Sequence, residues 1–499
     1  MSYRLSAFSD VRLDQAKLNL VIDEHERGRV PRFDTLWTYY RNPLQPVGVG
    51  RGASGRWYRQ PQEQGLPARL RAAAAHALPD DRAQRREVVI ENDIAWRIQA
   101  MVDFMFGKPV AIRSTAQQAK RTIIERVLDQ VWEQSGGIAL LQDIALMGHV
   151  FGHVDLLIRV DEDRLARTAA VPADADAALA AASAITIEVV EPRRGIPLQN
   201  PHDYRLLDAY IIRSRAAQAE NTDTALSLRG VIRALTGKPG SAPTHTQPEV
   251  LEVISASAWH VYHNGELAWE QSRAWTAGRI PIVHIQNTAQ PLTFEGAGEV
   301  EPLIPLQDEL NTRLSDRANR VTLQSFKMYL AKGIEGMDHV GPGQIWSTDN
   351  LQASVEAFGG DAACPSEESH IREVREALDK VSGVPPLSGG VVQGRIGNLT
   401  SATALRITLM GLTAKTNRKR VTYGRGIAQA CELILAVLDT AGVLATDPAE
   451  RTISLDWPDP LPADIRDTVA AAQLREAVGV PESEIARDLR IGATDHGVQ

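Results

Sequence analysis

Two helical segments on either side of a short glycine-rich stretch constrain this fold more than any other feature of the sequence. Residues 299–330 and residues 366–381 both carry apolar side chains at helical spacing, which places those side chains on one face of each helix. The stretch between them, residues 331–365, is weakly strand-like and too short to bury a core of its own. We therefore expect two paired helices that carry a small β module between them.

The body of the chain reads as helices followed by a largely antiparallel sheet. Helices are expected over residues 92–106, with Asn92 as N-cap, over 116–134, and from after Gly136-Gly137 to Met147. Strands are expected over residues 153–160, 184–192, 207–215, 249–263 and 280–287. The prolines of the first ninety residues argue against any long helix there. Residues 166–184 and 236–248 read as insertions at the edge of the sheet.

The last third of the chain is dominated by one very long helical stretch. Residues 383–398 are rich in glycine and proline and predict an irregular loop, which leads into a helix over residues 400–440. A final helical piece is expected over residues 463–491, with an interruption at 479–481.

Composition excludes several classes of protein. Hydrophobic residues make up 43% of the 499-residue chain and charged residues 23%, which are ordinary values for a globular protein. Two distant cysteines, Cys364 and Cys431, provide neither a disulfide framework nor a metal-binding pair. The start of the chain lacks the pattern of a signal peptide, and no membrane span is expected. The net charge of −8 argues against a dedicated, tightly binding nucleic-acid protein.

Catalytic and cofactor motifs find little support. Residues 50–55 match a dinucleotide-binding glycine pattern, but the prolines around them exclude the strand and helix that such a site needs. His149 and His153 are four residues apart without the glutamate of a metalloprotease, and His260 and His263 fall on opposite faces of a strand, so half-buried structural histidines are expected. No serine nucleophile elbow or phosphate loop occurs. The sequence predicts no catalytic residue, metal site or cofactor.

A basic cluster lies on the long helix and has two interpretations. It comprises Lys415, Arg418, Lys419, Arg420 and Arg425. Such a run is most often a solvated face. The alternative is a surface that attracts the phosphates of passing DNA by long-range electrostatics.

The order of these parts resembles the portal proteins of tailed bacteriophages, from Asn92 to about residue 492. The resemblance rests on residues 92–110, 278–287, 299–320, 341–346 (GPGQIW), 383–390 (GVPPLSGG), 398–420 and 457–489. Each stretch alone is weak, but their number and order make the match specific. Residues 1–90 and the two insertions have no counterpart in this resemblance.

The resemblance implies an α+β fold with a portal-type architecture. Residues 1–298 would form an N-terminal arm and a wing of helices plus a mixed, mostly antiparallel sheet. Residues 299–330 and 366–382 would be two stem helices, and 331–365 a small β-rich clip. Residues 383–398 would be a tunnel loop, 399–462 the long tunnel helix with its return, and 463–499 a short helical crown with the C-terminal tail.

The resemblance also implies candidate functional residues. Those expected to line a DNA tunnel are Val391, Val392, Gln393, Arg395, Asn398, Lys415, Arg418 and Lys419. Those expected to pack the stem helices between subunits of a ring are Leu303, Leu306, Leu310, Leu314 and Val321. Those expected to contact other proteins through the clip are His339, Gln344, Trp346 and Asp349.

The function implied by the family is mechanical. Its members form rings, commonly of twelve subunits, at one vertex of the capsid, where double-stranded DNA enters and leaves. The expected partners are further copies of the chain, double-stranded DNA held transiently, the terminase large subunit, a head–tail adaptor and the major capsid or scaffolding protein, with no membrane and no cofactor. The expected location is the virion, and the host cytoplasm during assembly. Alternatives are a nucleotide-binding or hydrolytic enzyme, disfavoured by the missing phosphate loop, and a head–tail adaptor, disfavoured by the length of the chain.

Overall fold

The computed structural model of the chain comprises two compact units. It describes residues 3–46, 58–71, 87–169, 175–203, 206–215, 249–271, 278–325, 328–332, 352, 354–358, 364–386, 406–461, 473 and 477. The large unit combines Met1–Asp34, Gln99–Gly298 and Val384–Gln499, and the small unit combines Thr35–Ile98 and Glu299–Gly383. Sequence analysis groups residues 35–98 with the wing, whereas their contacts are with residues 299–383.

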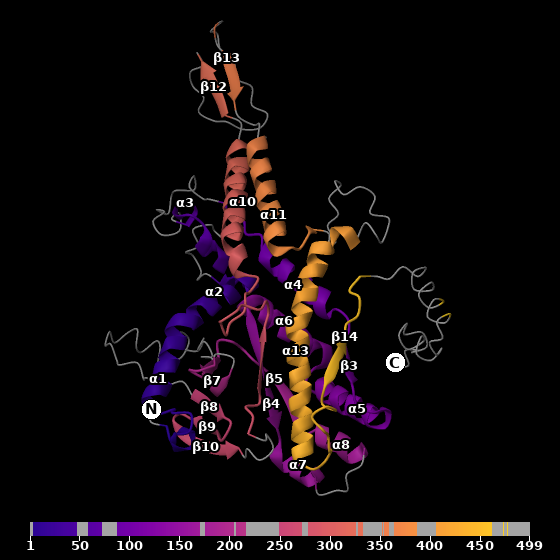
Figure 1. Cartoon of the computed structure of the whole chain (residues 1–499). Helices are drawn as coiled ribbons and strands as arrows, with labels where there is room; N and C mark the ends of the chain where they lie inside the picture. The colour runs from indigo at the N-terminus through magenta and orange to yellow at the C-terminus, as the bar shows by residue number, and fades with distance from the viewer. Residues whose placement is uncertain are drawn as a thin grey trace, which may run out of the picture. The chain divides into compact units, whose positions relative to one another are not determined.

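The small unit contains the expected helix pair and β module. The helices α10 (Ile304–Ser325) and α11 (Pro365–Ser382) lie side by side, and the strands β12 (Met328–Lys332) and β13 (Ser354–Phe358) pair antiparallel between them in the sequence (Figure 1). Because β12 begins at Met328, the first helix is shorter than the sequence predicts. α11 ends where Gly383 adopts a left-handed conformation with φ of 70°.

Short elements complete the small unit. They are β1 (Gln45–Pro46), β2 (Tyr58–Arg59), η3 (Pro61–Gly65), α3 (Ala68–Arg71) and η8 (Glu301–Leu303). The helix α4 (Asp93–Phe106) begins in this unit and continues into the large one, and the side chain of Asn92 accepts a hydrogen bond from the amide of Ala95 at 3.2 Å. The predicted N-cap is therefore confirmed.

The large unit is built on antiparallel sheets, as the sequence predicts. Its five-stranded sheet has the order β10-β9-β8-β7-β6, its three-stranded sheet the order β11-β4-β5, and β14 pairs with β3. The strands are β3 (Ala111–Ser114), β4 (His153–Val160), β5 (Ile185–Val190), β6 (Gly195–Gln199), β7 (Leu207–Arg215), β8 (Glu249–Ser255), β9 (Trp259–His263), β10 (Glu266–Gln271), β11 (Ile282–Gln286) and β14 (Ile453–Asp456).

The predicted strand over residues 249–263 is in fact a hairpin of β8 and β9. The side chain of Ser255 accepts hydrogen bonds from the amides of Ser257 and Ala258, at 3.2 and 3.0 Å, which reverses the chain between the two strands. Serine competes locally with the sheet ladder in this way, and an apolar alternation does not reveal it.

The N-terminal segment is helical, contrary to the sequence-based prediction. The helix α1 (Gln15–Glu24) passes through a π turn, η2 (His25–Arg29), into α2 (Val30–Arg41). The amide of Val30 bonds to the carbonyl of His25, one residue further back than in an α-helix. This wide turn lets the helix continue past Pro31, which has no amide hydrogen to donate. Leu18 of α1 and Phe8 of η1 (Ser6–Phe8) pack on one face of the five-stranded sheet.

The predicted insertion at residues 166–184 also proves to be structured. It contains the second half of α7 (Glu162–Ala169) and all of α8 (Ala175–Ala182). Ala178, Ala181 and Ala182 are buried, and α8 packs on α5 (Gln118–Gln134). Alanine lets helices approach closely, so an alanine-rich segment that resembles a loose insertion is part of the core here.

The long helix α13 (Met410–Thr440) runs against the three-stranded sheet and β14 (Figure 1). A side chain in place of Gly426 would place its Cβ 2.3 Å from Ile285 of β11, so glycine is needed where helix and sheet cross. By length and composition alone, α13 could cross a membrane, with mean hydropathy of 1.2 in its most apolar window, but 56% of that window is buried inside the protein. Just over half of this apolar window therefore faces the interior of the protein. The large unit also contains α6 (Gly137–Phe151).

Candidate functional site

The two helices of the small unit are held together by an apolar seam. Leu303 and Leu310 are fully buried and Leu314 nearly so, as are Ile371, Val374 and Leu378 on α11. These leucines cannot contact another subunit, because residues of the same chain already cover them. The expectation that Leu303, Leu310 and Leu314 pack between subunits is corrected accordingly. Of the five predicted ring contacts, Leu306 is partly exposed and Val321 is 42% exposed.

Charged side chains also connect α10 with α11. Arg320 pairs with Glu367, and the Nε2 of His370 lies 2.9 Å from Oε1 of Glu309. Burial alone would raise the pKa of Glu309, but the hydrogen bonds from His370 and Arg313 lower it overall. These pairs fix the register of the two helices.

A feature that sequence analysis missed is a ladder of polar side chains on α10. Gln307, Asn311, Ser315 and Asn319 recur every four residues and face residues 87–91, an extended segment that we call the strap. Asn319 accepts a hydrogen bond from the amide of Glu87 at 2.8 Å and donates one to the carbonyl of Glu87 at 2.7 Å. Ser315 accepts from the amide of Val89 at 3.0 Å. Asn311 accepts from the amide of Glu91 at 3.0 Å, and Gln307 donates to the carbonyl of Glu91 at 2.5 Å.

The ladder follows from the dimensions of the two elements. Four residues of helix rise about 6.0 Å, and two residues of extended chain span about 6.6 Å. Asn319, Ser315 and Asn311 therefore meet every second residue of the strap, and Gln307 meets the carbonyl of its last residue. The side chains of Gln307, Asn311 and Ser315 are fully buried. Uncharged polar residues recurring every four positions along this helix would have been the signal in the sequence.

Arg97 of α4 anchors the C-terminal end of α11. It is 2% exposed, and its guanidinium lies 2.7 Å from Asp379 and 3.3 Å from Asp93, beside the ring of Trp96. Burial raises the pKa of Asp379, and the opposing effect of Arg97 offsets this rise only in part. The anchored end lies immediately before residues 383–398, the predicted tunnel loop.

The basic cluster on α13 does not form one surface. Arg418 is exposed and Lys415 partly so, but Lys419 is 2% exposed, with its ammonium 3.8 Å from the sulfur of Met101. Arg420 lies over the ring of Trp457 and donates to the carbonyl of Pro458 at 2.9 Å. Lys419 therefore points into the core of the large unit, which removes it from the residues that could reach DNA.

The remaining predicted site residues fall outside the described part of the chain. They are the tunnel residues Val391, Val392, Gln393, Arg395 and Asn398, and the clip residues His339, Gln344, Trp346 and Asp349. Their roles stay predictions.

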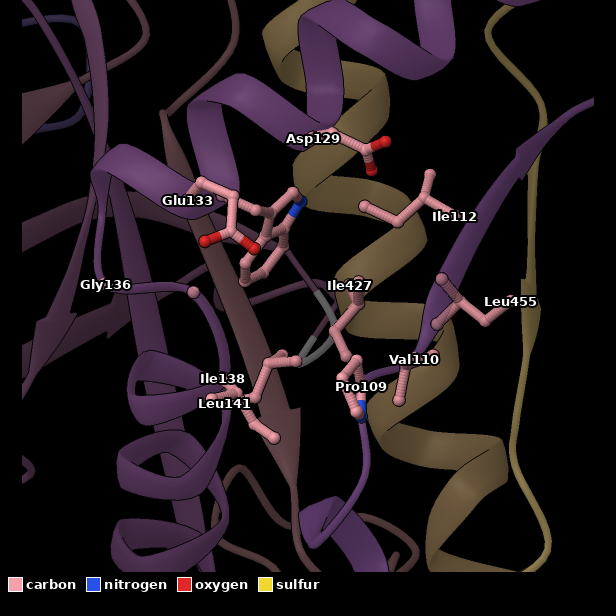
Figure 2. Close-up of a pocket in the computed structure, with 12 residues that line it drawn as sticks. Pro109, Val110, Ile112, Asp129, Glu133, Gly136, Ile138, Leu141, Ile427 and Leu455 are labelled. Atoms are coloured by element: carbon pink, nitrogen blue, oxygen red, sulfur yellow. The ribbon is translucent and has the colours of Figure 1, made fainter. Parts of the chain in front are cut away.

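A cavity of about 220 Å³ opens in the large unit between α5, α6, α13 and the β3–β14 pair. Figure 2 shows its apolar lining, which includes Ile112, Ile427 and Leu455, and the carboxylates of Asp129 and Glu133 at one side. Burial raises the pKa of Asp129, and the nearby charges of Glu125 and Glu133 raise it further. The nearby charge of Arg113 acts on the pKa of Asp129 in the opposite direction. The site thus combines an apolar floor with two carboxylates that have no ion pair among the described residues.

A buried polar network connects the two larger sheets. Asp155 of β4 accepts hydrogen bonds from the hydroxyl of Tyr210 on β7 and from Nδ1 of His284 on β11, both at 2.6 Å. Nε2 of His284 lies 2.7 Å from the carbonyl of Phe294, so both ring nitrogens of His284 have a polar neighbour. Burial would raise the pKa of Asp155, but His284 lowers it overall. Beside it, burial lowers the pKa of His153 to about 4.

The histidines are more varied than the sequence suggests. His149, His153 and His260 are fully buried rather than half-buried, and His263 is exposed. Within the residues that the structure describes, no group of three or more histidine, cysteine or acidic side chains could hold a metal ion.

Comparisons with known proteins identify the family. Among solved structures, the chain is similar to one titled "Virion of native gene transfer agent (GTA) particle", with 12% identity, a TM-score of 0.38 and coverage of 79% of this chain and 88% of that one. It is also similar to "Neck of empty GTA particle computed with C6 symmetry", with 11% identity, a TM-score of 0.40 and coverage of 80% and 90%. No curated protein matches the sequence. Residues 20–489 match the family "Phage portal protein, SPP1 Gp6-like", and the chain therefore belongs to the phage portal proteins.

Proposed function

We propose that this protein assembles as a closed ring at one capsid vertex and serves as the conduit through which double-stranded DNA is packaged and ejected. The observation that carries the proposal is the α10–α11 pair with β12 and β13 between its helices, because so small a β module needs neighbours to support it. Identical subunits joined head to tail form such a support when their rotation closes into a ring. We propose twelve subunits, the common number in the family.

DNA contact is proposed for the predicted tunnel loop and for Lys415. A duplex carries one negative charge per about 1.7 Å, so a continuous basic wall would hold it too tightly to let it move. A chain with a net charge of −8 and a few exposed cations avoids this. The loop residues Val391, Val392, Gln393, Arg395 and Asn398 combine small, neutral and single basic side chains, which suits weak, non-specific contact.

Partners are proposed from the same anatomy. His339, Gln344, Trp346 and Asp349 would contact the terminase large subunit during packaging and the head–tail adaptor afterwards, while the wing would meet the major capsid or scaffolding protein. The protein would reside at the portal vertex of the virion, and in the host cytoplasm during assembly. We propose no enzymatic role, since the sequence offers neither a nucleophile motif nor a phosphate loop.

Imaging of the purified protein tests the ring. Negative-stain electron microscopy should show annular particles with a central hole, and light scattering should give the mass of a ring of about twelve subunits. A monomer at high concentration, with no annular images, would refute the proposal. Turnover of nucleoside triphosphates by the purified protein would favour an enzyme instead.

The conduit role is tested by deleting residues 391–397. We expect rings of unchanged mass but capsids that package or retain less DNA. Particles filled with a normal amount of genome would exclude a role of this loop in handling DNA.

A further inference from the structure

One face of α13 is exposed along half of the helix. It consists of Met410, Ala414, Arg418, Val421 and Arg425, spaced by three or four residues, all of which are exposed. Met410 is 66% exposed and Val421 62%, which is unusual for large apolar side chains on a helix whose other side forms the core. Neither Arg418 nor Arg425 has an ion pair with a described residue. We call this face the α13 stripe.

The cavity described above lies on the other side of the same helix. Ile427, which lines it, is nine residues from Arg418, and at about 100° per residue the two side chains point in opposite directions around the axis of α13. The large unit thus carries an apolar and basic face on one side of α13 and an apolar and acidic cavity on the other. Two different surfaces on opposite sides of a subunit are what a head-to-tail contact requires.

The chemistry of the two surfaces is complementary. The cavity offers the carboxylates of Asp129 and Glu133, which have no ion pair within the described part of the chain, above the apolar side chains of Ile112 and Leu455 (Figure 2). Its volume of about 220 Å³ exceeds the roughly 150 Å³ that hold a benzene molecule in an engineered cavity, so it can admit one aliphatic side chain. The stripe presents a valine with an arginine on each side.

We propose that the α13 stripe of one subunit docks on the cavity of its neighbour in the ring, with Val421 on the apolar floor and Arg418 and Arg425 paired with Asp129 and Glu133. This inference rests on the proposed function, because it presumes a ring. Arginine suits such a contact, since its planar guanidinium binds carboxylates in bidentate fashion and is weakly hydrated. The site is incomplete in a single chain, and the neighbour supplies the missing cations.

Charge reversal tests the pairing. We expect Arg418→Glu with Arg425→Glu, or Asp129→Lys with Glu133→Lys, to raise the protein concentration needed for half assembly by about tenfold or more, because each places like charges opposite one another. All four substitutions together should restore assembly. Arg164→Glu, which makes the same change at an exposed position of α7, is the control and should leave assembly unchanged.

A cross-link gives an independent measurement. Ile138, 37% exposed at the cavity, and Val421 are replaced by cysteine in a Cys364→Ser background. A short thiol-reactive cross-linker should then produce a ladder of covalent multimers from the double variant, and none from either single variant.

The outcomes separate this inference from the proposed function. If the wild-type protein forms no ring, the proposed function fails first. If rings form, but neither reversed pair affects them or the fourfold variant does not recover, the inference is overturned while the portal role stands. Intact rings that lose only the retention of DNA when Arg418 and Arg425 are reversed would show that the stripe faces DNA, and would equally overturn it.

Discussion

The ladder between α10 and the strap allows the effect of burial on stability to be separated from the effect of the number of hydrogen bonds. Asn311 is fully buried, and its side chain makes three hydrogen bonds. It accepts from the amide of Glu91 and from the side chain of Gln307, and it donates to the side chain of Gln62. Asn319 also makes three, but two are to the partly solvated peptide of Glu87. Replacing Asn311 by alanine leaves polar groups that water cannot reach without a hydrogen bond, at a cost of about 1–3 kcal/mol each. The free energy needed to open the strap should therefore fall by about 2–4 kcal/mol. Water can replace Asn319, so Asn319→Ala should cost about 0.5–1 kcal/mol.

Hydrogen exchange of the backbone amides measures this directly. At 1.4 kcal/mol per tenfold, Asn311→Ala should lower the protection of the amides of Glu91 and Val89 by about 30- to 1,000-fold, and Asn319→Ala by less than about tenfold. Mass spectrometry of peptides that cover residues 87–92 gives the ratio without assuming two-state unfolding of the whole chain. Equal losses in the two variants, or a greater loss for Asn319→Ala, would refute the argument that burial rather than bond number decides the cost.

Three further predictions concern stability. Leu310→Ala should destabilise the small unit by about 2–5 kcal/mol and lower its melting temperature, since Leu310 is fully buried, whereas Val321→Ala should change stability by less than about 0.5 kcal/mol; similar shifts for the two would contradict the burial seen here. Arg97→Met should cost about 3 kcal/mol, because it leaves the buried carboxylate of Asp93 and the partly exposed carboxylate of Asp379 unpaired, and adding Asp379→Leu should recover part of the loss; a double variant no more stable than Arg97→Met would argue against this pairing. Burial lowers the pKa of His153 from 6.5 to about 4, so the unfolded chain binds the proton more readily than the folded one. About 3 kcal/mol of stability should therefore be lost as pH falls from 6.5 to 4, and His153→Leu should flatten the slope of melting temperature against pH over that range. An unchanged slope would show that other groups titrate there.

The sequence predicted best where a periodic pattern coincided with burial. The α10–α11 pair, α5 and the strands β4, β5, β7 and β11 follow apolar patterns, and the sequence predicted each of them. It did not predict the strands β3, β6, β10 and β14. The N-terminal helix was missed because a proline such as Pro31 normally interrupts a helix. The π turn that accommodates Pro31 depends on a hydrogen bond that no local sequence pattern predicts. The hairpin at Ser255 was missed for a similar reason.

The candidate site was less predictable than the fold, because exposure depends on tertiary contacts. Lys415, Arg418 and Lys419 lie within five positions of one another, yet the last is buried against Met101. Leu303 and Leu310 belong to a stripe that the sequence assigned to a neighbouring subunit, whereas α11 covers it within the chain. An apolar periodicity predicts that one face of a helix is covered, but it does not identify the partner that covers it.

The crossing at Gly426 limits how the long helix can move. Ile285 occupies the space that a side chain at residue 426 would need, and the hydroxyl of Tyr423 donates to Asn287 at 3.0 Å nearby. If α13 slid by one turn, it would present Thr422 or Ala430 to Ile285, and either side chain would collide with it. The tight approach therefore opposes sliding of α13 along the three-stranded sheet, and we expect helix and sheet to move together at this crossing.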